Sequence, residues 1–142
     1  MQNFRFGVPS KGRLSEITGE LLKQAGLSYR RQERSLFARV RELPIDITFL
    51  RTEDIPVLCA EGAIDMGITG SDLVAEANVD IATRLDLGVG ECRLSICVPE
   101  SSPAKSVRDL SGARVATSFP HVTETHFKQH GSDLHLVNLS GS

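Results

Sequence analysis

The sequence has few cysteines, no strong excess of either charge and no long hydrophobic run. Its three cysteines form no CxxC pair and leave one unpaired under any disulfide scheme, which favours a reducing compartment. A formal net charge of −2 excludes a broad basic surface for nucleic acid and a polybasic membrane patch. No apolar run of about 18 residues and no apolar signal-peptide core are present. We therefore expect a cytoplasmic protein in which any anion site is local.

Common catalytic and nucleotide-binding motifs are also missing. The chain contains no Walker loop and lacks the GxGxxG spacing of a dinucleotide-binding fold. No serine, histidine and aspartate arrangement indicates hydrolysis. Internal repeats and low-complexity tracts are absent as well. A nucleotide or phosphate site in this chain must therefore use other residues.

The chain does carry short strands that alternate with short helices. With 142 residues, 40% of them hydrophobic, it suits one domain or two small lobes. The alternation predicts an α/β fold with a largely parallel sheet covered by helices. We expect strands at residues 3–8, 34–41, 45–50, 63–68, 79–85, 93–98, 114–118 and 134–139, and helices at 12–25, 71–77 and 122–129. A further helix, capped by Thr52 or Asp54, is expected to end near Glu61.

The predicted helix at residues 12–25 rests on a regular apolar pattern. Its apolar residues recur at helical spacing, and Gly26 stands where a glycine C-cap belongs. Residues 34–41 and 45–50 are expected to pair as a hairpin, because apolar and polar residues alternate in the second of them. The apolar residues of the helix are Leu14, Ile17, Leu21, Leu22 and Ala25.

A change of composition at "DLGVGE", residues 86–91, predicts a flexible connection between two lobes. The first lobe covers residues 1–90 and carries the candidate nucleotide-binding turns. The second covers residues 91–142, where we expect about three strands and one helix. Such a lobe is incomplete, and its unfinished sheet has an open edge that favours self-association. We therefore expect the isolated chain to be marginally stable.

Two cations stand at the predicted start of the first helix. Lys11 and Arg13 oppose the helix dipole there, at a cost of about 0.3–1 kcal/mol each. A bound phosphate would turn this cost into a gain in free energy, because the free N–H groups of the first turn, the dipole and both side chains would converge on it. Gly12 would let the backbone approach such a ligand. The alternative is that both side chains simply extend into water.

A second strand-to-helix junction lies in "DMGITGSD", residues 65–72. Thr69, Gly70 and Asp72 follow a predicted strand, at the edge of a parallel sheet where ligands bind. The two turns could face the same crevice. In the alternative interpretation, Gly70 only makes the turn and Ser71 or Asp72 caps a helix.

Other basic, histidine and cysteine residues are weaker candidates. Arg34, Arg51 and Arg93 lie near strand ends and could add positive charge, although single arginines are often solvated. His126 and His130 share a helical face but have no nearby third ligand, so we expect a solvated face and not a metal site. The cysteines are expected to be small core residues. They are Cys59, Cys92 and Cys97.

Six blocks in the chain carry a family resemblance. They are "SKGRL", "RTEDIP", "GAIDMGITGSDLVAE", "DLGVGECRL", "ATSFP" and "LSGS". In this order they resemble the N-terminal portion of ATP phosphoribosyltransferase, the enzyme that opens histidine biosynthesis. The resemblance implies a fold like that of type II periplasmic binding proteins, with two α/β lobes and an active site in the cleft between them.

The resemblance also implies a reaction and site residues. N1 of the adenine of ATP displaces pyrophosphate from phosphoribosyl pyrophosphate, with Mg²⁺ assisting. Lys11 and Arg13 match phosphate-contacting positions, Arg34 in "ERSLFAR" matches a second arginine, and Arg13 and Arg34 are the implied catalytic residues. Cys92 matches a cleft-lining position, as a packing or nucleotide-contacting residue. The full set of implied substrate-binding residues is Lys11, Gly12, Arg13, Arg34, Arg51, Thr69, Gly70, Asp72 and Cys92.

The resemblance stops before an important element. The family continues past the Gly-Ser of "LSGS" with an acidic residue and a loop of Asp, Thr and Gly that holds the 5′-phosphate of phosphoribosyl pyrophosphate. We therefore expect either a fragment of a longer enzyme or a truncated product. Partners implied are ATP, phosphoribosyl pyrophosphate and further copies of the chain, with a regulatory subunit as an additional option. The alternative is a non-catalytic nucleotide- or anion-binding module, or a subunit that needs a partner.

Overall fold

The structure is a computed structural model that describes residues 2–139 and has a mixed α/β fold. The predicted α/β class is confirmed. The chain forms two compact units that divide between Gly90 and Glu91, inside the segment where the composition changes. Residues 140–142, which belong to the last block of the resemblance, lie outside the described residues.

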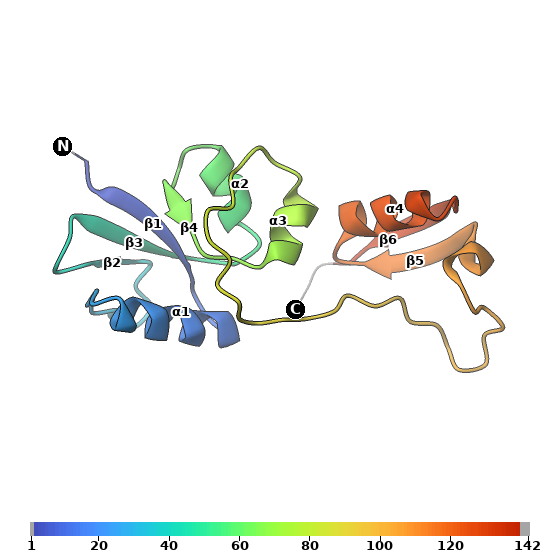
Figure 1. The fold of residues 1–142 in the computed structure, drawn as a ribbon, viewed down its shortest axis with the longest axis horizontal. Coiled ribbons are helices and arrows are strands. Elements are labelled where there is room, and N and C mark those ends of the chain that lie inside the picture. Colours follow the sequence, from blue (N-terminus) through green and yellow to red (C-terminus); the bar gives the residue numbers. More distant parts are fainter. Residues whose placement is uncertain (1, 140–142) are drawn as a thin grey trace. The chain divides into compact units, whose positions relative to one another are not determined.

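The first unit is built on a four-stranded sheet with the order β2-β3-β1-β4 (Figure 1). The strands are β1 (Phe4–Pro9), β2 (Phe37–Arg39), β3 (Ile45–Leu50) and β4 (Met66–Gly67). β1 pairs in parallel with β3 and β4, whereas β2 pairs antiparallel with β3 as the predicted hairpin. Three strands therefore end at the same edge of the sheet.

The helices of this unit are α1 (Arg13–Gln24), α2 (Ile55–Ala60) and α3 (Ser71–Ala77). α1 ends as its sequence predicts, because Gly26 has a φ of +81° and its N–H donates to the carbonyl of Lys23. The next N–H, of Leu27, reaches back to Leu22 at 2.9 Å. None of the described helices is both long and apolar enough to cross a membrane.

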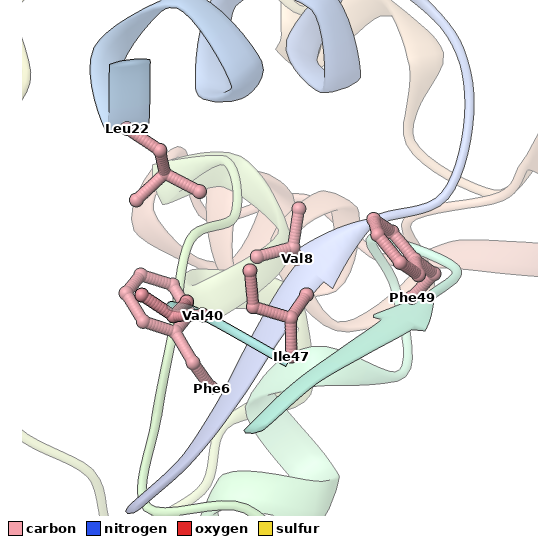
Figure 2. Close-up of a cluster of buried hydrophobic side chains, with 6 residues drawn as sticks. All are labelled: Phe6, Val8, Leu22, Val40, Ile47 and Phe49. Atoms are coloured by element: carbon pink, nitrogen blue, oxygen red, sulfur yellow. The ribbon is translucent and has the colours of Figure 1, made fainter. Parts of the chain in front are cut away.

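The main core lies between the sheet and α1. Alternate residues of β1 and β3 point to the same face, where they meet Leu22 of α1 (Figure 2). Burial of each such side chain contributes about 1.5–3 kcal/mol. The buried cluster consists of Phe6, Val8, Leu22, Val40, Ile47 and Phe49.

On the other face, glycine lets α2 approach the sheet closely. A Cβ at Gly67 would lie 2.4 Å from Cγ2 of Ile55, the first residue of α2, and Ile55 is fully buried. A Cβ at Gly7 would lie 2.6 Å from Cδ1 of Ile64. Any larger side chain at either position would push these isoleucines away from the sheet.

The second unit contains a small parallel sheet of β5 (Ala113–Thr117) and β6 (Leu134–Asn138). The 3₁₀ helix η1 (Val107–Leu110) precedes β5, and the helix α4 (Pro120–Gln129) connects the two strands. Phe127 of α4 is fully buried and anchors the helix. α4 begins two residues earlier than predicted, because Pro120 suits the first turn of a helix.

The strands predicted at residues 79–85 and 93–98 are wrong. The structure has no strand in either segment, and β4 is only two residues long where residues 63–68 were expected. Leu94, Ile96 and Val98, expected in a buried strand, are 54%, 42% and 41% exposed. The physical reason is that a strand needs a hydrogen-bonded neighbour, and no described strand pairs with these segments.

The predicted burial of the cysteines is also wrong. Cys59 is half-buried, and Cys92 and Cys97 are exposed. All three are free thiols. Cys97 lies in the segment that does not form the expected strand and Cys92 directly before it, so the same missing neighbour explains their exposure.

Candidate functional site

The candidate site lies where β1, β3 and β4 end. We call it the carboxyl edge and define it by the turns at residues 10–13, 51–54 and 68–72, which follow these strands. Because the strands are parallel, all three turns belong to one edge of the sheet. Ligands of open α/β sheets bind at this edge.

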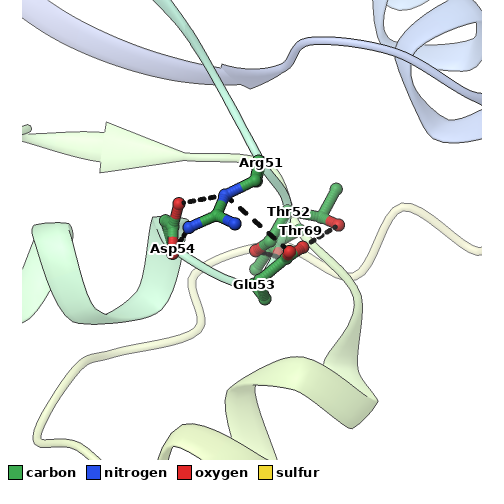
Figure 3. A network of polar contacts seen from close by, with 5 residues as sticks. All are labelled: Arg51, Thr52, Glu53, Asp54 and Thr69. Atoms are coloured by element: carbon green, nitrogen blue, oxygen red, sulfur yellow. Dashed lines mark hydrogen bonds and ion pairs between the residues drawn. The ribbon is translucent and has the colours of Figure 1, made fainter. Parts of the chain in front are cut away.

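Hydrogen bonds connect the three turns. The N–H of Ser10 donates to the carbonyl of Leu50 at 2.8 Å, which fixes the first turn beside the second. The hydroxyl of Thr69 donates to the carbonyl of Thr52 at 2.8 Å, which joins the third turn to the second (Figure 3). The hydroxyl proton of Thr69 is thus already used inside the protein, and its oxygen remains an acceptor for a ligand.

The turn at residues 10–13 leaves backbone donors free. Gly12 is the N-cap of α1, with a φ of +87° that favours glycine and no side-chain cap. The N–H groups of Arg13, Leu14 and Ser15 donate to no described residue. The first bond of the helix is instead made by Glu16, whose N–H reaches the carbonyl of Gly12 at 3.3 Å. Three free N–H groups at a helix start are suited to an anion.

The cationic side chains of this turn are unpaired within the described part of the chain. Lys11 and Arg13 are exposed and form no ion pair with a described residue. Glu16 supplies the acidic group that the first turn of a helix ordinarily favours. The placement of Lys11 and Arg13 is therefore not explained by a local carboxylate.

Arg31 adds a third cation to the turn. Its Nη1 donates to the carbonyl of Ser10 at 2.7 Å, and its Cζ lies 3.9 Å from the centre of the Phe49 ring. A cation over an aromatic ring contributes about 0.5–1 kcal/mol at an exposed position. In the sequence, Arg31 belongs to the charged run "RRQER", residues 30–34, a pattern that is typical of a solvated surface. No sequence signal identifies it, since its position depends on how the loop before β2 folds back.

Arg34 is exposed on the loop before β2, with a φ of +62°. No hydrogen bond or ion pair joins it to a described residue of the carboxyl edge. The neighbouring loop is fixed by the N–H of Phe49, which donates to the carbonyl of Leu36 at 2.8 Å. The structure therefore leaves the predicted role of Arg34 as a prediction.

Arg51 does not add an unpaired cation to the edge. Its Nε lies 2.8 Å from Oδ2 of Asp54 and 3.9 Å from Oε1 of Glu53 (Figure 3). The hydrogen bond that Arg51 donates to the carboxylate of Asp54 raises the pKa of Arg51. With one arginine and two carboxylates, the turn at residues 51–54 has a net charge of −1. The positive charge of the carboxyl edge therefore comes from the turn at residues 10–13 and from Arg31.

Asp54 does not cap α2 with its side chain as predicted. It is the N-cap residue of α2, but its carboxylate makes no cap hydrogen bond. The carboxylate instead accepts from Nε and Nη2 of Arg51, at 2.8 and 3.3 Å. An arginine partner three residues away thus takes the place of the backbone N–H groups.

The turn at residues 68–72 leads into α3. Gly70, and neither Ser71 nor Asp72, is the N-cap, and it makes no side-chain cap. Oδ1 of Asp72 accepts from the N–H of Leu73 at 2.9 Å. A Cβ at Gly70 would lie 2.3 Å from this oxygen, so glycine leaves room for the carboxylate in this orientation. Asp72 thus lies at the start of its own helix, where the dipole favours an anion.

Cys92 and Arg93 belong to the second unit and are both exposed. The carboxyl edge lies wholly in the first unit. Their implied proximity to a ligand stays a prediction.

The described residues form no metal centre. No group of three or more His, Cys, Asp and Glu side chains that could hold a metal ion is found among residues 2–139. The rings of His126 and His130 lie 4.5 Å apart, and Nδ1 of His130 lies 2.9 Å from the carbonyl oxygen of His126. At the carboxyl edge, the carboxylate of Asp54 is occupied by Arg51. The protein groups present therefore do not fit a dedicated magnesium site.

Two open surface hollows lie at the opposite edge, where the strands begin. One is lined by Gln2, Asn3, Phe4, Pro44 and Asp65, and none of the candidate residues lines either hollow. The carboxylate of Asp65 there binds the guanidinium and the N–H of Arg5. These bonds join the segment before β4 to β1, so we assign this edge a structural role.

Comparisons with known proteins point to one family. A family model described as ATP phosphoribosyltransferase matches residues 51–142. The ATP phosphoribosyltransferase of Rhodopirellula baltica is 61% identical over 138 residues, which cover 97% of this chain and 46% of that protein. The enzyme of that name from Methanosarcina acetivorans is 43% identical over 140 residues, which cover 97% of this chain and 48% of that protein. The chain thus spans about half the length of the curated relatives that it matches.

A solved structure shows a similar fold. It is the "ATP phosphoribosyl transferase (HisG:HisZ) complex" from Thermotoga maritima, with a TM-score of 0.69 and 23% sequence identity. The match covers 98% of this chain and 65% of that one. At this identity the likeness concerns the fold alone.

Proposed function

The chain belongs to the ATP phosphoribosyltransferase family, and we propose that it supplies the nucleotide-binding part of an enzyme that joins ATP to phosphoribosyl pyrophosphate. This is a glycosyl transfer that opens histidine biosynthesis in the cytoplasm. The observation that supports it best is the turn at residues 10–13. Free N–H groups, two unpaired cations and Arg31 meet there at the carboxyl edge of a parallel sheet.

In this proposal the turn at residues 10–13 binds a polyphosphate group. The N–H groups of Arg13, Leu14 and Ser15 donate to phosphate oxygens, and Lys11 supplies a further charge. Hydrogen bonds between charged partners contribute about 1.5–3 kcal/mol each. Gly12 keeps the backbone open, because nothing lies within 4 Å of its Cβ position.

The proposed reaction needs positioning and charge stabilisation more than covalent chemistry. N1 of adenine donates its electron pair to C1 of the ribose, and the bond from C1 to the pyrophosphate oxygen breaks. Pyrophosphate leaves with the electron pair of that bond, so it must be stabilised as it leaves. We assign this role to Arg13 and Arg34, since a fixed cation stabilises developing negative charge without rearrangement.

The other turns of the edge hold the nucleotide in this proposal. Thr69 contributes its free lone pair, Gly70 lets the backbone come close, and Asp72 accepts a hydrogen bond from a ligand hydroxyl or amine. Arg51 acts through its pair with Asp54 and shapes the neighbouring turn. Cys92 contacts the ligand from the second unit. Because the described residues form no metal centre, we propose that Mg²⁺ arrives on the phosphates of the substrates.

We further propose that the complete enzyme has two lobes of the type II periplasmic-binding-protein kind, of which the second is incomplete in this chain. The fold likeness to the Thermotoga maritima protein supports this, as does the division of the chain after Gly90. The Thermotoga maritima structure is named as a HisG:HisZ complex, which supports a second kind of subunit as a partner. We also propose that the enzyme assembles from several copies of its chain.

The first test is ATP binding by charge-reversal variants of α1. We expect Arg13→Glu to weaken ATP binding by about 10-fold or more, because it replaces a charge-assisted contact with a repulsive one. Lys23→Glu is the matched control, since it makes the same charge change in the last turn of the same helix. Isothermal titration calorimetry measures the affinity of both variants for ATP. Equal affinities of the two variants would show that the turn does not bind the nucleotide.

A second candidate function is a module that binds ATP without turnover. The turn at residues 10–13 supports it as well, because free N–H groups at a helix start suit the binding of an anion whether or not a reaction follows. Measuring pyrophosphate release in the presence of ATP and phosphoribosyl pyrophosphate distinguishes the binding module from the enzyme. A binding module releases none with the 142-residue chain, whereas a competent enzyme releases it in proportion to enzyme concentration.

A further inference from the structure

Both backbone hydrogen-bonding groups of Ser10 are held inside the first unit. Its N–H donates to the carbonyl of Leu50 at 2.8 Å, and its carbonyl accepts from Nη1 of Arg31 at 2.7 Å. Ser10 directly follows β1 and begins the turn at residues 10–13. The chain therefore enters this turn in a fixed orientation.

The bond from Arg31 also orients the peptide group between Ser10 and Lys11. A trans peptide group is planar, so its N–H points away from its carbonyl, and the described chain contains no cis peptide bond. Because the carbonyl of Ser10 points to Arg31, the N–H of Lys11 points to the opposite side. This N–H donates to no described residue. Arg31 thus fixes the direction of a free donor just before α1.

The guanidinium of Arg31 is itself supported by the core. Its Cζ lies 3.9 Å from the centre of the Phe49 ring, and Phe49 belongs to the buried cluster between the sheet and α1 (Figure 2). The ring of Tyr29 lies 6.2 Å from that of Phe49. A planar guanidinium that rests on a buried ring has few orientations left, so it holds the carbonyl of Ser10 in one place.

No described carboxylate explains the position of Arg31. It forms no ion pair with a described residue, and its bond to Ser10 uses one of the five N–H donors of the guanidinium. The arginines of the first unit that do pair with a carboxylate are Arg5, Arg39 and Arg51. Arg31 donates to a neutral carbonyl instead, so its positive charge stays available beside the turn.

The turn presents its free N–H groups in two sets. The first set, Arg13, Leu14 and Ser15, lies in the first turn of α1 and points along the helix axis. The second set, Lys11 and Gly12, precedes the helix and also donates to no described residue. Successive N–H groups of this kind cradle phosphates. Two adjacent sets suit two adjacent phosphoryl groups, because a single group bound at the helix start leaves the second set unused.

We propose that Arg31 is the positioning residue of this turn and makes it selective for two or more linked phosphoryl groups over a single phosphate. Arg31 acts through the carbonyl of Ser10. The N–H of Lys11, oriented in this way, binds the second phosphoryl group while the start of α1 binds the first. This role rests on the proposed function, in which the turn binds a polyphosphate, and it adds the residue that selects the length of the phosphate chain.

The test compares two probes, inorganic pyrophosphate and inorganic phosphate, by isothermal titration calorimetry. We expect the 142-residue chain to bind pyrophosphate about 10-fold or more tightly than phosphate. Arg31→Ala is expected to weaken pyrophosphate binding by about 3- to 10-fold and phosphate binding by less than about 2-fold, because the second phosphoryl group alone loses its donor. Arg30→Ala is the matched control, since Arg30 is an exposed neighbour in the same charged run, and it is expected to change neither affinity.

Nitrogen–proton correlation NMR identifies the donors that each probe uses. In the original chain, pyrophosphate is expected to shift the amide signals of Lys11, Leu14 and Ser15. In Arg31→Ala, the shift at Lys11 is expected to be lost, whereas the shifts at Leu14 and Ser15 stay. A merely structural role of Arg31 would change the stability of the chain and leave both the preference for pyrophosphate and these shifts as they are.

Two outcomes with Arg31→Ala would overturn the proposal. One is an unchanged preference for pyrophosphate, and the other is an equal loss of affinity for both probes, which would make Arg31 a general cation. Arg13→Glu separates these failures from a failure of the proposed function. If Arg13→Glu loses affinity for both probes and Arg31→Ala keeps the preference, the turn binds phosphate without selection by Arg31. If neither probe binds the original chain, or if Arg13→Glu binds both as well as the original chain does, the proposed function fails together with the role of Arg31.

Discussion

At the scale of single residues, the candidate site depends on which cations have a carboxylate partner. Arg51 is bound by Asp54, and Arg5 is bound by Asp65 at the other edge of the sheet. Lys11 and Arg13 have no such partner among the described residues. The location of a ligand anion is thus better indicated by unpaired charge than by the number of arginines.

Arg31 is expected to contribute to nucleotide affinity. Arg31→Ala removes the cation beside Ser10, and we expect it to weaken ATP binding by about 3- to 10-fold. Arg30→Ala is the control, since Arg30 is an exposed neighbour in the same charged run. Calorimetric titration at two salt concentrations measures the effect. If the two alanine variants bind ATP equally, Arg31 has only a structural role.

The sequence could predict some residues of the site and not others. The position of Lys11, Gly12 and Arg13 at the carboxyl edge was predictable, because strand, turn and helix follow one another directly in the chain. Their role in binding stays a prediction. The pairing of Arg51 with Asp54 has a local signal in the sequence, namely opposite charges three residues apart. Arg31 has no local signal, because its partners are Ser10 and Phe49, which lie far from it in the sequence.

At the scale of elements, the sequence predicted those helices and strands that form through interactions between residues close in the chain. α1 and the β2-β3 hairpin are confirmed, because helical spacing, the Gly26 cap and strand alternation act within short stretches. The strands expected at residues 79–85 and 93–98 are wrong although their apolar patterns suit strands. Strand formation depends on a neighbour, and the pattern of one segment contains no information on whether that neighbour is present.

The contact between α2 and the sheet can be tested at Gly67. We expect Gly67→Ala to lower the free energy of unfolding by about 1–3 kcal/mol, because its Cβ would overlap with Ile55. Urea denaturation measures this change.

Gly19→Ala is the matched control. A Cβ at Gly19 would lie 3.7 Å from the hydroxyl of Tyr29, an ordinary contact, and alanine favours the helix by up to about 1 kcal/mol. The two substitutions are thus expected to have opposite signs. A destabilising effect of similar size in both would contradict the close approach of α2.

At the scale of the whole molecule, both units carry carboxylates whose pKa is lowered in the folded state. In the first unit, hydrogen bonds from Ser28 lower the pKa of Glu42, and those from Arg5 lower the pKa of Asp65. In the second, the N–H groups of Lys105 and Ser106 lower the pKa of Asp109. Each group stabilises the fold above its unfolded pKa of about 4, and this contribution is lost as the pH falls through the lower folded value.

The melting temperature is therefore expected to fall as the pH is lowered below about 4. Asp65→Asn is expected to make this fall shallower, because one of the groups that takes up a proton is gone. Melting curves recorded by circular dichroism from pH 7 to pH 3 measure both effects. A variant with the same pH dependence as the original chain would show that the Arg5–Asp65 pair does not contribute.

The family resemblance, which rests on blocks spread over the whole chain, is confirmed by the family model and the relatives. The turn that follows the short strand β4 is joined to another turn of the carboxyl edge. The hydroxyl of Thr69 donates to the carbonyl of Thr52, which is 17 residues away in the sequence. Because the two loops are joined, they share their mobility. When one of them is immobilised, the other therefore has less conformational entropy left to lose.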